Sequence, residues 1–510
     1  MKKINKILIA NRSEIAIRIS RAATELGFQT VSIYSYEDRF ALHRFKTDES
    51  YLVGSGKGPI QAYLDYKGIV KIAVDSGCDA IHPGYGFLSE NPDFVDECVK
   101  NNILFIGPSA KIMRSLGNKV EAKKIANKSK VATIPSTGPL PKDIKSCKVL
   151  AKKIGYPIML KASWGGGGRG MRVINKESEL EKSISSARRE AKSAFGKDDV
   201  FFEKLIEKAY HVEVQIIGDT HGNIVHLFER DCSLQRRHQK VVERAPAAYL
   251  TANQRLAICD AGVKIGKQVN YSCAGTVEFL MDAKTKEFFF IEVNPRVQVE
   301  HTVTEEITGI DIVKAQFLLA AGAKIGDNFC GVPNQQDIYI KGHAIQSRVT
   351  TEDAANDFAP DYGKISVYRS ASGLGIRLDA GTASTGTVIT PYYDSLLVKV
   401  TAKGQTPLEA TRRMDRALRE FRVRGVKTNI PFLLKLINHD CFESFQYHTK
   451  YIDSAKDLFN FSSRKDRATK VLSFLAEVIV NGNPEVNNRP KLRETIPAKL
   501  SDYGLSLIHI

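Results

Sequence analysis

Ten residues near the middle of the chain carry an unusual set of polar side chains, with the sequence EVNPRVQVEH at positions 292–301. They follow an apolar run at 288–291, which predicts a buried strand. Side chains alternate between faces along an extended chain, so every second residue shares a face. That face would carry Glu292, Asn294, Arg296, Gln298 and Glu300. Such a set can hold a divalent cation at one end and a small planar anion at the other.

A second strand is predicted just upstream, at residues 276–281, with a turn-rich gap at 282–287. If the turn is centred near Thr285, Glu278 lies directly opposite Glu292 in a hairpin. Like charges facing each other destabilise a sheet, and a bound cation between them would reverse that effect. Magnesium suits such a pair, because it takes a few carboxylates and completes its shell with phosphate oxygens. Two solvated glutamates on an exposed hairpin remain an alternative.

Length and composition limit the class of protein. The 510 residues predict two or three domains, with 43% hydrophobic and 26% charged residues as in ordinary globular proteins. Neither an 18-residue apolar run nor a secretory signal is present, so we expect a cytoplasmic protein with no membrane partner. The eight cysteines lack metal-ligand spacing. The net charge of +17 is spread along the chain without interleaved aromatics, which argues against nucleic acid.

The elements that must position these residues begin with a strand at 7–10, a helix through Ile15 and Leu26 that ends at Gly27, and a strand at 30–34. Asn11 and Glu14 resemble a capping box. This α/β beginning predicts a doubly wound domain, although the Gly-x-Gly-x-x-Gly dinucleotide motif is missing. A Gly/Pro loop at 82–91 follows a strand at 80–81 and is either functional or a structural turn.

A glycine-rich segment lies further along. Residues 116–133 are expected to be helical, and a βαβ-like unit with strands at 157–162 and 171–174 follows. Between these strands lie four consecutive glycines in SWGGGGRG, at 163–170. The loop runs from strand to strand, which predicts a flexible hairpin and not a Walker loop, because a Walker loop leads into a helix. The backbone N–H groups of such a loop can cradle phosphate, and its flexibility favours a mobile lid over a rigid turn. Lys161, just before the loop, could reach a phosphate.

Three later segments also carry candidate ligands. Residues 201–206 are apolar enough for a strand or a hinge beside a flat ligand, and 211–215 alternate as a strand does. Residues 231–240 are polar and cationic, which predicts a solvated basic loop, or phosphate contacts if a magnesium–phosphate site lies nearby.

Taken together, these segments resemble the biotin carboxylase domain of the ATP-grasp superfamily from residue 7 to about residue 432. Several motifs in one order are far more specific than any single one. The matching motifs are IANR at 9–12, HPGYGFLSE at 82–90, the glycine loop within 161–172, ERDC at 229–232, QRRHQKVV at 235–242, EVNPRVQVEH at 292–301, GHAIQSR at 342–348 and YYDSL at 392–396.

Within that family the chain is most similar to the N-terminal part of pyruvate carboxylases, on residues 368–370, 375–379, 420–432 and 474–484. The resemblance implies a Rossmann-like pre-ATP-grasp domain at 1–115, an ATP-grasp domain at 116–325 with a mobile glycine-rich lid at 134–204, and a C-terminal α+β domain at 326–450. Residues 451–510 would lead towards a carboxyltransferase domain, which the sequence lacks together with the biotinyl Met-Lys-Met motif.

The resemblance also implies the reaction: carboxylation of biotin with ATP and bicarbonate, as the first half-reaction of a biotin-dependent carboxylase. Biotin would come from a carrier domain or protein, a carboxyltransferase domain or subunit would follow, and the enzyme would be a homo-oligomer. The implied ATP ligands are Lys119, Lys161, Gly166, Gly167, Gly168, Glu203, Lys204, Leu205, Ile206, His211, Gln235 and His238. The implied ligands of Mg²⁺ or Mn²⁺ are Glu278, Glu292 and Asn294.

The same resemblance assigns the bicarbonate site and the catalytic residues. Bicarbonate would be held by Lys240, Arg296, Gln298 and Val299. Glu300 would be the general base that deprotonates it, and Arg348 would stabilise the enolate-like oxygen of biotin. These roles agree with the chemistry, because bicarbonate is a poor nucleophile until it loses its proton.

Three alternatives remain open. The chain could be the biotin carboxylase subunit of an acetyl-CoA or other acyl-CoA carboxylase. It could also be another ATP-grasp ligase that joins a carboxylate to an amine through an acyl phosphate. A binding or regulatory module that has lost its chemistry is a third reading, and the joint presence of Lys240, Glu300 and Arg348 argues against it.

Overall fold

The computed structural model describes residues 2–164, 171–461 and 467–482. The chain divides into two units after Phe459. The described part of the second unit is residues 460–461 and 467–482, which include helix α16 (Arg467–Asn481). Within the described ranges, no helix combines the length and apolar character needed to cross a bilayer. All eight cysteines are buried thiols.

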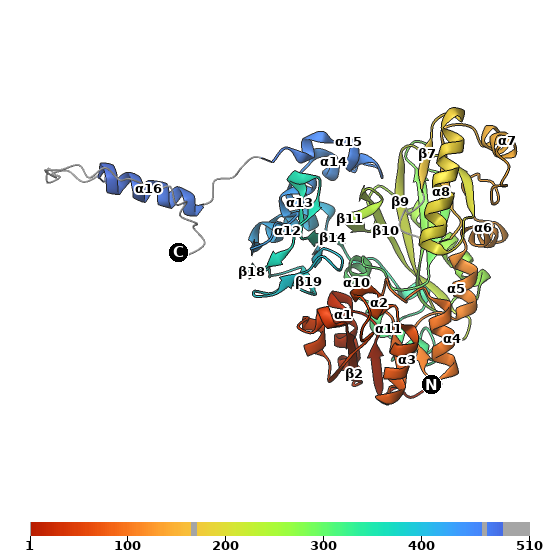
Figure 1. The fold of residues 1–510 in the computed structure, drawn as a ribbon, viewed down its shortest axis with the longest axis horizontal. Helices are drawn as coiled ribbons and strands as arrows, with labels where there is room; N and C mark the ends of the chain where they lie inside the picture. Colours follow the sequence, from red (N-terminus) through yellow and green to blue (C-terminus); the bar gives the residue numbers. More distant parts are fainter. Residues whose placement is uncertain (1, 165–170, 462–466, 483–510) are drawn as a thin grey trace. The chain divides into compact units, whose positions relative to one another are not determined.

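The N-terminal part is a five-stranded parallel sheet in the order β3-β2-β1-β4-β5 (Figure 1, red and orange). Crossover helices connect parallel strands, as the predicted doubly wound fold requires. Its strands are β1 (Lys6–Ile9), β2 (Gln29–Tyr34), β3 (Glu49–Leu52), β4 (Ala80–His82) and β5 (Leu104–Phe105). Its helices are α1 (Ser13–Glu25), α2 (Pro59–Tyr63), α3 (Tyr66–Asp75), α4 (Pro92–Lys100) and α5 (Ala110–Gly117).

The predicted capping box at the start of α1 is wrong. Arg12 is the N-cap residue and makes no side-chain cap bond. The amide of Asn11 instead donates to the carbonyls of Pro83 and Tyr85, and Glu14 accepts from the Tyr85 hydroxyl. Contacts with the 82–91 loop therefore replace the local cap.

A small antiparallel sheet, in the order β7-β6-β8, forms the next part. Its strands are β6 (Ile158–Ala162), β7 (Arg172–Ile174) and β8 (Val200–Lys204), and its helices are α7 (Ile144–Ile154) and α8 (Leu180–Phe195). Because β6 and β7 are antiparallel, they form the hairpin predicted for these two strands, and the βαβ-like arrangement expected around them is wrong. The glycines of its loop, 165–170, lie outside the described residues.

The helical structure expected at 116–133 is confirmed in part, since the segment is interrupted at Asn118 and its helix ends at Lys128. Helix α5 ends at Gly117 and α6 (Lys119–Lys128) begins after Asn118. Asn118 has extended backbone angles, and its side chain accepts from the N–H groups of Val120 and Glu121. An asparagine N-cap therefore divides the segment.

An eight-stranded antiparallel sheet, in the order β13-β12-β9-β10-β11-β14-β21-β19, forms the largest part. Its strands are β9 (Ala209–Gly218), β10 (Ile224–Arg236), β11 (Gln239–Ala245), β12 (Cys273–Asp282), β13 (Phe288–Asn294), β14 (His343–Thr350), β19 (Ile376–Ala380) and β21 (Leu396–Gly404). The associated helices are α9 (Ala252–Gln268), α10 (His301–Thr308), α11 (Ile312–Ala320) and α12 (Pro407–Glu420). The sheet continues across the predicted boundary at 325/326.

Shorter elements complete the compact unit. The two-stranded pairs are β15 (Glu352–Asp353) with β16 (Ala359–Pro360), β17 (Gly363–Lys364) with β20 (Val388–Ile389), and β18 (Val367–Arg369) with β22 (Arg422–Arg424). The remaining α-helices are α13 (Ile430–Ile437), α14 (Asp440–Glu443) and α15 (Tyr451–Ser454). The 3₁₀ helices are η1 (Tyr36–Asp38), η2 (Leu42–Lys46), η3 (Glu177–Glu179), η4 (Gln335–Asp337), η5 (Ala354–Asn356) and η6 (Lys456–Phe459).

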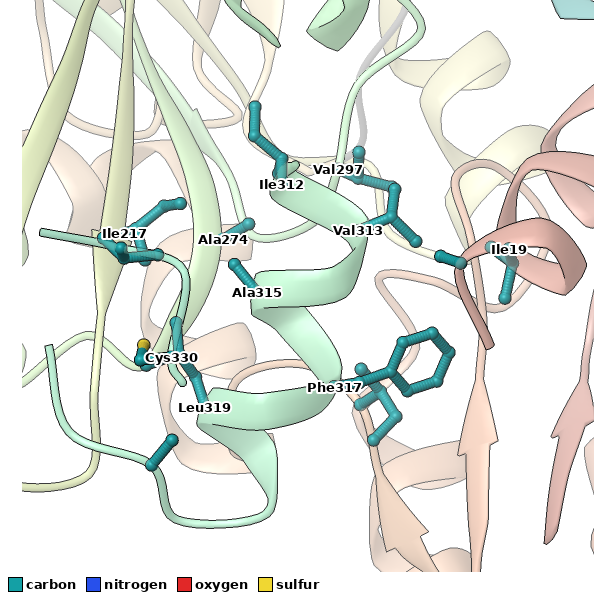
Figure 2. Close-up of a cluster of buried hydrophobic side chains, with 14 of the residues drawn as sticks. Ile19, Ile217, Ala274, Val297, Ile312, Val313, Ala315, Phe317, Leu319 and Cys330 are labelled. Carbon is teal, nitrogen blue, oxygen red and sulfur yellow. The ribbon is translucent and has the colours of Figure 1, made fainter. Parts of the chain in front are cut away.

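Helix α11 joins the N-terminal part to the large sheet. Figure 2 shows its apolar side chains spreading to both sides, with Ile19 of α1 beyond Phe317 and Ile217 of β9 on the opposite side. The Phe317 ring packs edge-on against His82 and Phe28, at centroid distances of 5.2 and 5.7 Å. One buried apolar cluster therefore fixes the loop after β4 relative to the sheet that carries the polar site.

Two further expectations are corrected in the large sheet. Residues 231–240 are not a loop: β10 continues to Arg236, and Arg237 and His238, both with positive φ, form the two-residue turn into β11. The alternation predicted for 292–300 stops at Asn294, where β13 ends. Pro295 has no N–H to continue the ladder, and the chain after it bends at Arg296 and reaches a turn at Val299 and Glu300.

Candidate functional site

Three glutamates lie side by side across the large sheet. The register pairs Glu278 of β12 with Glu292 of β13, as the hairpin prediction required. It also pairs Glu278 with Glu213 of β9, which sequence reasoning missed. Directly paired residues share a face, so three carboxylates form a row that needs positive charge to be stable.

Lys240 of β11 supplies much of that charge. Its ammonium lies 2.5 Å from Glu213, 2.9 Å from Glu278 and 2.6 Å from Glu300. Burial lowers the pKa of Lys240, but the three carboxylates outweigh burial and raise it well above its usual value. Lys240 is therefore a permanent cation, as the bicarbonate role predicted for it requires.

Glu300 is held between two cations. One of its oxygens lies 2.6 Å from Lys240, and the other accepts from Arg348 at 3.0 Å. Arg348 also pairs with the buried Glu243 at 2.5 Å. Burial alone would raise the pKa of Glu300, but Lys240 and Arg348 outweigh it and hold the pKa far below its ordinary range. The structure thus brings the predicted base and the predicted biotin residue into direct contact.

A fully buried arginine that sequence reasoning missed positions the amide ligands. Arg230 pairs with Glu213 at 2.5 Å and donates to the Gln298 side-chain oxygen at 2.7 Å. The amide nitrogens of Gln298 and Asn294 in turn donate to one oxygen of Glu278, each at 2.9 Å. The segment after β13 therefore converges on Glu278 although it is not a strand.

Arg296 and Val299 lie at the edge of the site that faces the 82–91 loop. Arg296 pairs with Glu90 of that loop at 2.6 Å and donates to the Asn294 side-chain oxygen at 3.2 Å. Arg296, Val299 and Arg348 line a cavity of about 1400 Å³, together with Glu14 and Tyr85. Three of the five predicted bicarbonate and biotin residues, Arg296, Val299 and Arg348, therefore border one cavity that is large enough for a small substrate.

The predicted ATP ligands form a second cluster around β6 and β8. The ammonium groups of Lys161 and Lys123 both pair with Glu203, and Lys123 was not predicted. Burial would raise the pKa of Glu203, but the two lysines outweigh it and lower the pKa. Lys119 reaches towards the metal candidates, 3.5 Å from Glu292. Two buried lysines on one carboxylate provide cations that an incoming phosphate can compete for.

The other predicted ATP ligands lie near the carboxylate row of the large sheet or near the lysines around Glu203. His211 faces Glu278 at 3.1 Å through Nε2, and its Nδ1 lies 3.0 Å from the Gln235 amide. Burial lowers the pKa of His238 at the β10–β11 turn, and the charge of Lys161 acts in the same direction. Lys204 ends β8, and Leu205 and Ile206 follow it as half-buried residues. Gly166, Gly167 and Gly168 lie outside the described residues.

The donor set around Glu278 and Glu292 fits a hard divalent cation. Both are carboxylates, they face each other across the hairpin, and the Asn294 amide adjoins them. His211, Glu213 and Glu278 also place one ligand atom each within 4.8 Å of one another. Oxygen ligands favour Mg²⁺ or Mn²⁺ over softer metals. The predicted assignment of metal and site residues stays a prediction.

Three protein-family models match successive segments of the chain, from the N-terminal sheet to near the end of the compact unit. The family model "Biotin carboxylase, N-terminal domain" matches residues 3–113, "Carbamoyl-phosphate synthase L chain, ATP binding domain" matches 118–328, and "Biotin carboxylase C-terminal domain" matches 346–454. The pyruvate carboxylase of Bacillus subtilis is 53% identical over 490 residues, covering 96% of this chain and 42% of that protein. The chain therefore spans about two fifths of the length of such relatives.

Solved structures agree with these matches. Pyruvate carboxylase from Rhizobium etli, solved with the allosteric activator acetyl coenzyme A, has a TM-score of 0.88 and 60% identity, covering 96% of this chain and 43% of that one. The biotin carboxylase domain of 2-oxoglutarate carboxylase from Hydrogenobacter thermophilus has a TM-score of 0.87 and 43% identity. That match covers 91% of this chain and all of the other, which was solved as a dimer with MgADP, ADP and bicarbonate.

Proposed function

The chain belongs to the biotin carboxylase family, and from that premise we propose that it carboxylates biotin: MgATP + bicarbonate + biotinyl carrier → ADP + phosphate + carboxybiotinyl carrier. The observation that carries the proposal is the placement of Glu300 between Lys240 and Arg348, beside the cavity that Arg296 and Val299 line. The predicted base thereby contacts Arg348, which lines the same cavity as Arg296 and Val299.

Bicarbonate must first be activated as a nucleophile. Its negative charge would be met by Lys240 and Arg296, and its proton would pass to a Glu300 oxygen. The low pKa of Glu300 makes it a weak base before substrate binds. An anion that draws Lys240 or Arg348 away from Glu300, and adds a like charge beside it, raises that pKa and strengthens the base.

Phosphoryl transfer to the bicarbonate oxygen needs charge neutralisation and alignment more than covalent help. Lys119, Lys123 and Lys161 would bind the phosphates, and exchange their present carboxylate partners for phosphate oxygens. Magnesium at Glu278 and Glu292 would neutralise the charge that develops between the phosphates. The carboxyphosphate formed in this way would break into CO₂ and phosphate, and the phosphate would accept the N1 proton of biotin. Arg348 would stabilise the deprotonated biotin while its N1 attacks CO₂.

We propose further that the complete enzyme is a pyruvate carboxylase. The high identity to pyruvate carboxylases along 96% of this chain supports pyruvate, rather than an acyl-CoA, as the final carboxyl acceptor. Its partners would then be a biotinyl carrier domain, a carboxyltransferase domain and further copies of itself; the dimeric state of the Hydrogenobacter domain supports the last of these. Eight buried thiols are compatible with the cytoplasm that we predict, where thiols remain reduced.

A turnover assay tests the activity. The purified chain is given MgATP, bicarbonate and free biotin, and ADP release and labelled carboxybiotin are measured separately. We expect both to require bicarbonate, and carboxybiotin to require biotin. ADP release that an amine stimulates instead would select the amide-forming ligase, and ATP binding without turnover would select a binding module.

A further inference from the structure

Lys399 of β21 is a buried lysine without a role in the proposed reaction. Its side chain is fully inaccessible to solvent. In the sheet it lies directly opposite Arg348 of β14 on one side and Asp379 of β19 on the other. A buried ammonium is costly unless it is paired and hydrogen-bonded, so its contacts must be specific.

Two polar groups meet this ammonium, which also lies 5.9 Å from the centre of the Tyr85 ring. It forms an ion pair with Glu14 of α1 at 3.1 Å, and it donates to the backbone carbonyl of Val299 at 3.1 Å. Glu14 in turn accepts from the Tyr85 hydroxyl, which belongs to the loop after β4. A link of side chains thus runs from the N-terminal part to the residue before Glu300.

The segment that Lys399 contacts has little backbone support of its own. β13 ends at Asn294, and residues 295–300 have no strand partner. Because the peptide unit is planar, holding the Val299 carbonyl also fixes the Glu300 N–H, which points the opposite way. The Glu300 side chain starts from that same backbone, so its approach to Lys240 and Arg348 depends on the orientation of this peptide.

On the proposed function, we infer that Lys399 is a positioning residue for the bicarbonate site, which fixes the 299–300 peptide through the Val299 carbonyl. The competing explanation is that Lys399 only neutralises the buried carboxylates of Glu14 and Asp379. Of these, Asp379 keeps its ion pair with Arg377 when Lys399 is replaced. The two differ in what a second substitution does. Removing the Glu14 charge repairs a neutralisation defect, but it cannot restore a donor to Val299.

Two variants and a control separate these explanations. Lys399→Met removes both contacts, and Lys399→Met with Glu14→Gln removes them without leaving an unpaired charge. Lys403→Met, on the same strand and half-buried outside the site, is the control. We expect a tenfold or greater rise in the KM for bicarbonate in both Lys399 variants, a KM for ATP within twofold of wild type, and no change in the control. Recovery of the bicarbonate KM in the double variant would overturn the inference.

A measurement independent of activity keeps this test apart from the proposed function. Amide hydrogen exchange in peptides that cover residues 297–302 should be at least tenfold faster in both Lys399 variants, with other segments of the sheet unchanged. This result is expected even if wild type shows no bicarbonate-dependent turnover. Absence of that turnover would contradict the proposed function but not the inference about Lys399. Unchanged exchange at 297–302, or failure of both variants to fold, would show that Lys399 is structural and would overturn the inference.

Discussion

Replacing Glu300 by glutamine removes one negative charge from the centre of the site and keeps the size of the side chain. The fold should survive, because no cation loses its last partner: Lys240 retains Glu213 and Glu278, and Arg348 retains Glu243. The amide oxygen can still accept from one of the two cations. The loss is therefore close to one hydrogen bond to a charged group, about 1.5–3 kcal/mol of stability.

Turnover should suffer more than folding. Glutamine cannot accept the bicarbonate proton, and loss of a general base typically costs about 10²–10⁴ in rate. That range corresponds to about 3–5 kcal/mol in the activation barrier. ATP binding should remain close to wild type, because the carboxylate contacts of Lys119 and Lys161 do not involve Glu300.

The assay measures bicarbonate-dependent ADP release and carboxybiotin formation side by side with ATP affinity. Glu305→Gln is the matched control, since Glu305 is a buried carboxylate five residues further on that pairs with Arg18 at 2.9 Å and Arg377 at 2.7 Å. It should lose stability to a similar degree but not rate. Near-normal carboxylation by Glu300→Gln, or an equal rate loss in Glu305→Gln, would refute the assignment of Glu300 as the base.

Three other perturbations test separate parts of the site. Arg348→Ala should abolish most carboxybiotin formation while part of the bicarbonate-dependent ATP cleavage persists, and equal losses in the two assays would contradict its role towards biotin. Glu292→Gln should raise the magnesium concentration needed for half-maximal ATP turnover, and an unchanged magnesium dependence would remove Glu292 from the ligand set. Burial raises the pKa of Glu14 from 4.5 to about 7, so the folded state holds this proton more tightly than the unfolded chain does. The stability of wild type relative to Glu14→Gln, measured by urea unfolding, should therefore be greatest below pH 4.5 and fall by up to about 3 kcal/mol as pH rises through 7; a flat difference would be the contrary result.

Local sequence patterns predicted the features that local geometry determines. The opposition of Glu278 and Glu292 follows from the position of one hairpin turn, and the structure confirms it. Glu213 could not be placed in the same row, because its pairing with Glu278 joins strands more than sixty residues apart. An alternating strand at 211–215 was visible, but nothing in it indicates which strand lies beside it.

The errors arose where a distant contact or a proline overrode a local preference. Asn11 has the sequence context of a cap, but its amide is used by carbonyls more than seventy residues away. Residues 296–300 have the alternation of a strand, but Pro295 ends the ladder before them. Their convergence on Glu278 and Lys240 comes instead from buried donors such as Arg230.

The continuous eight-stranded sheet limits how this chain can be divided for expression. A cut at 325/326 would separate β11 from β14, which pair from Val242 with Ser347 to Ala245 with Ala344. Each fragment would then expose an unpaired edge of mostly buried residues, which is a template for aggregation. Such a cut would also separate Glu243 from Arg348 and leave a charge in each piece without its buried partner. Fragments of this protein should therefore be made by cutting beyond Phe459, where the compact unit ends, and not at 325/326.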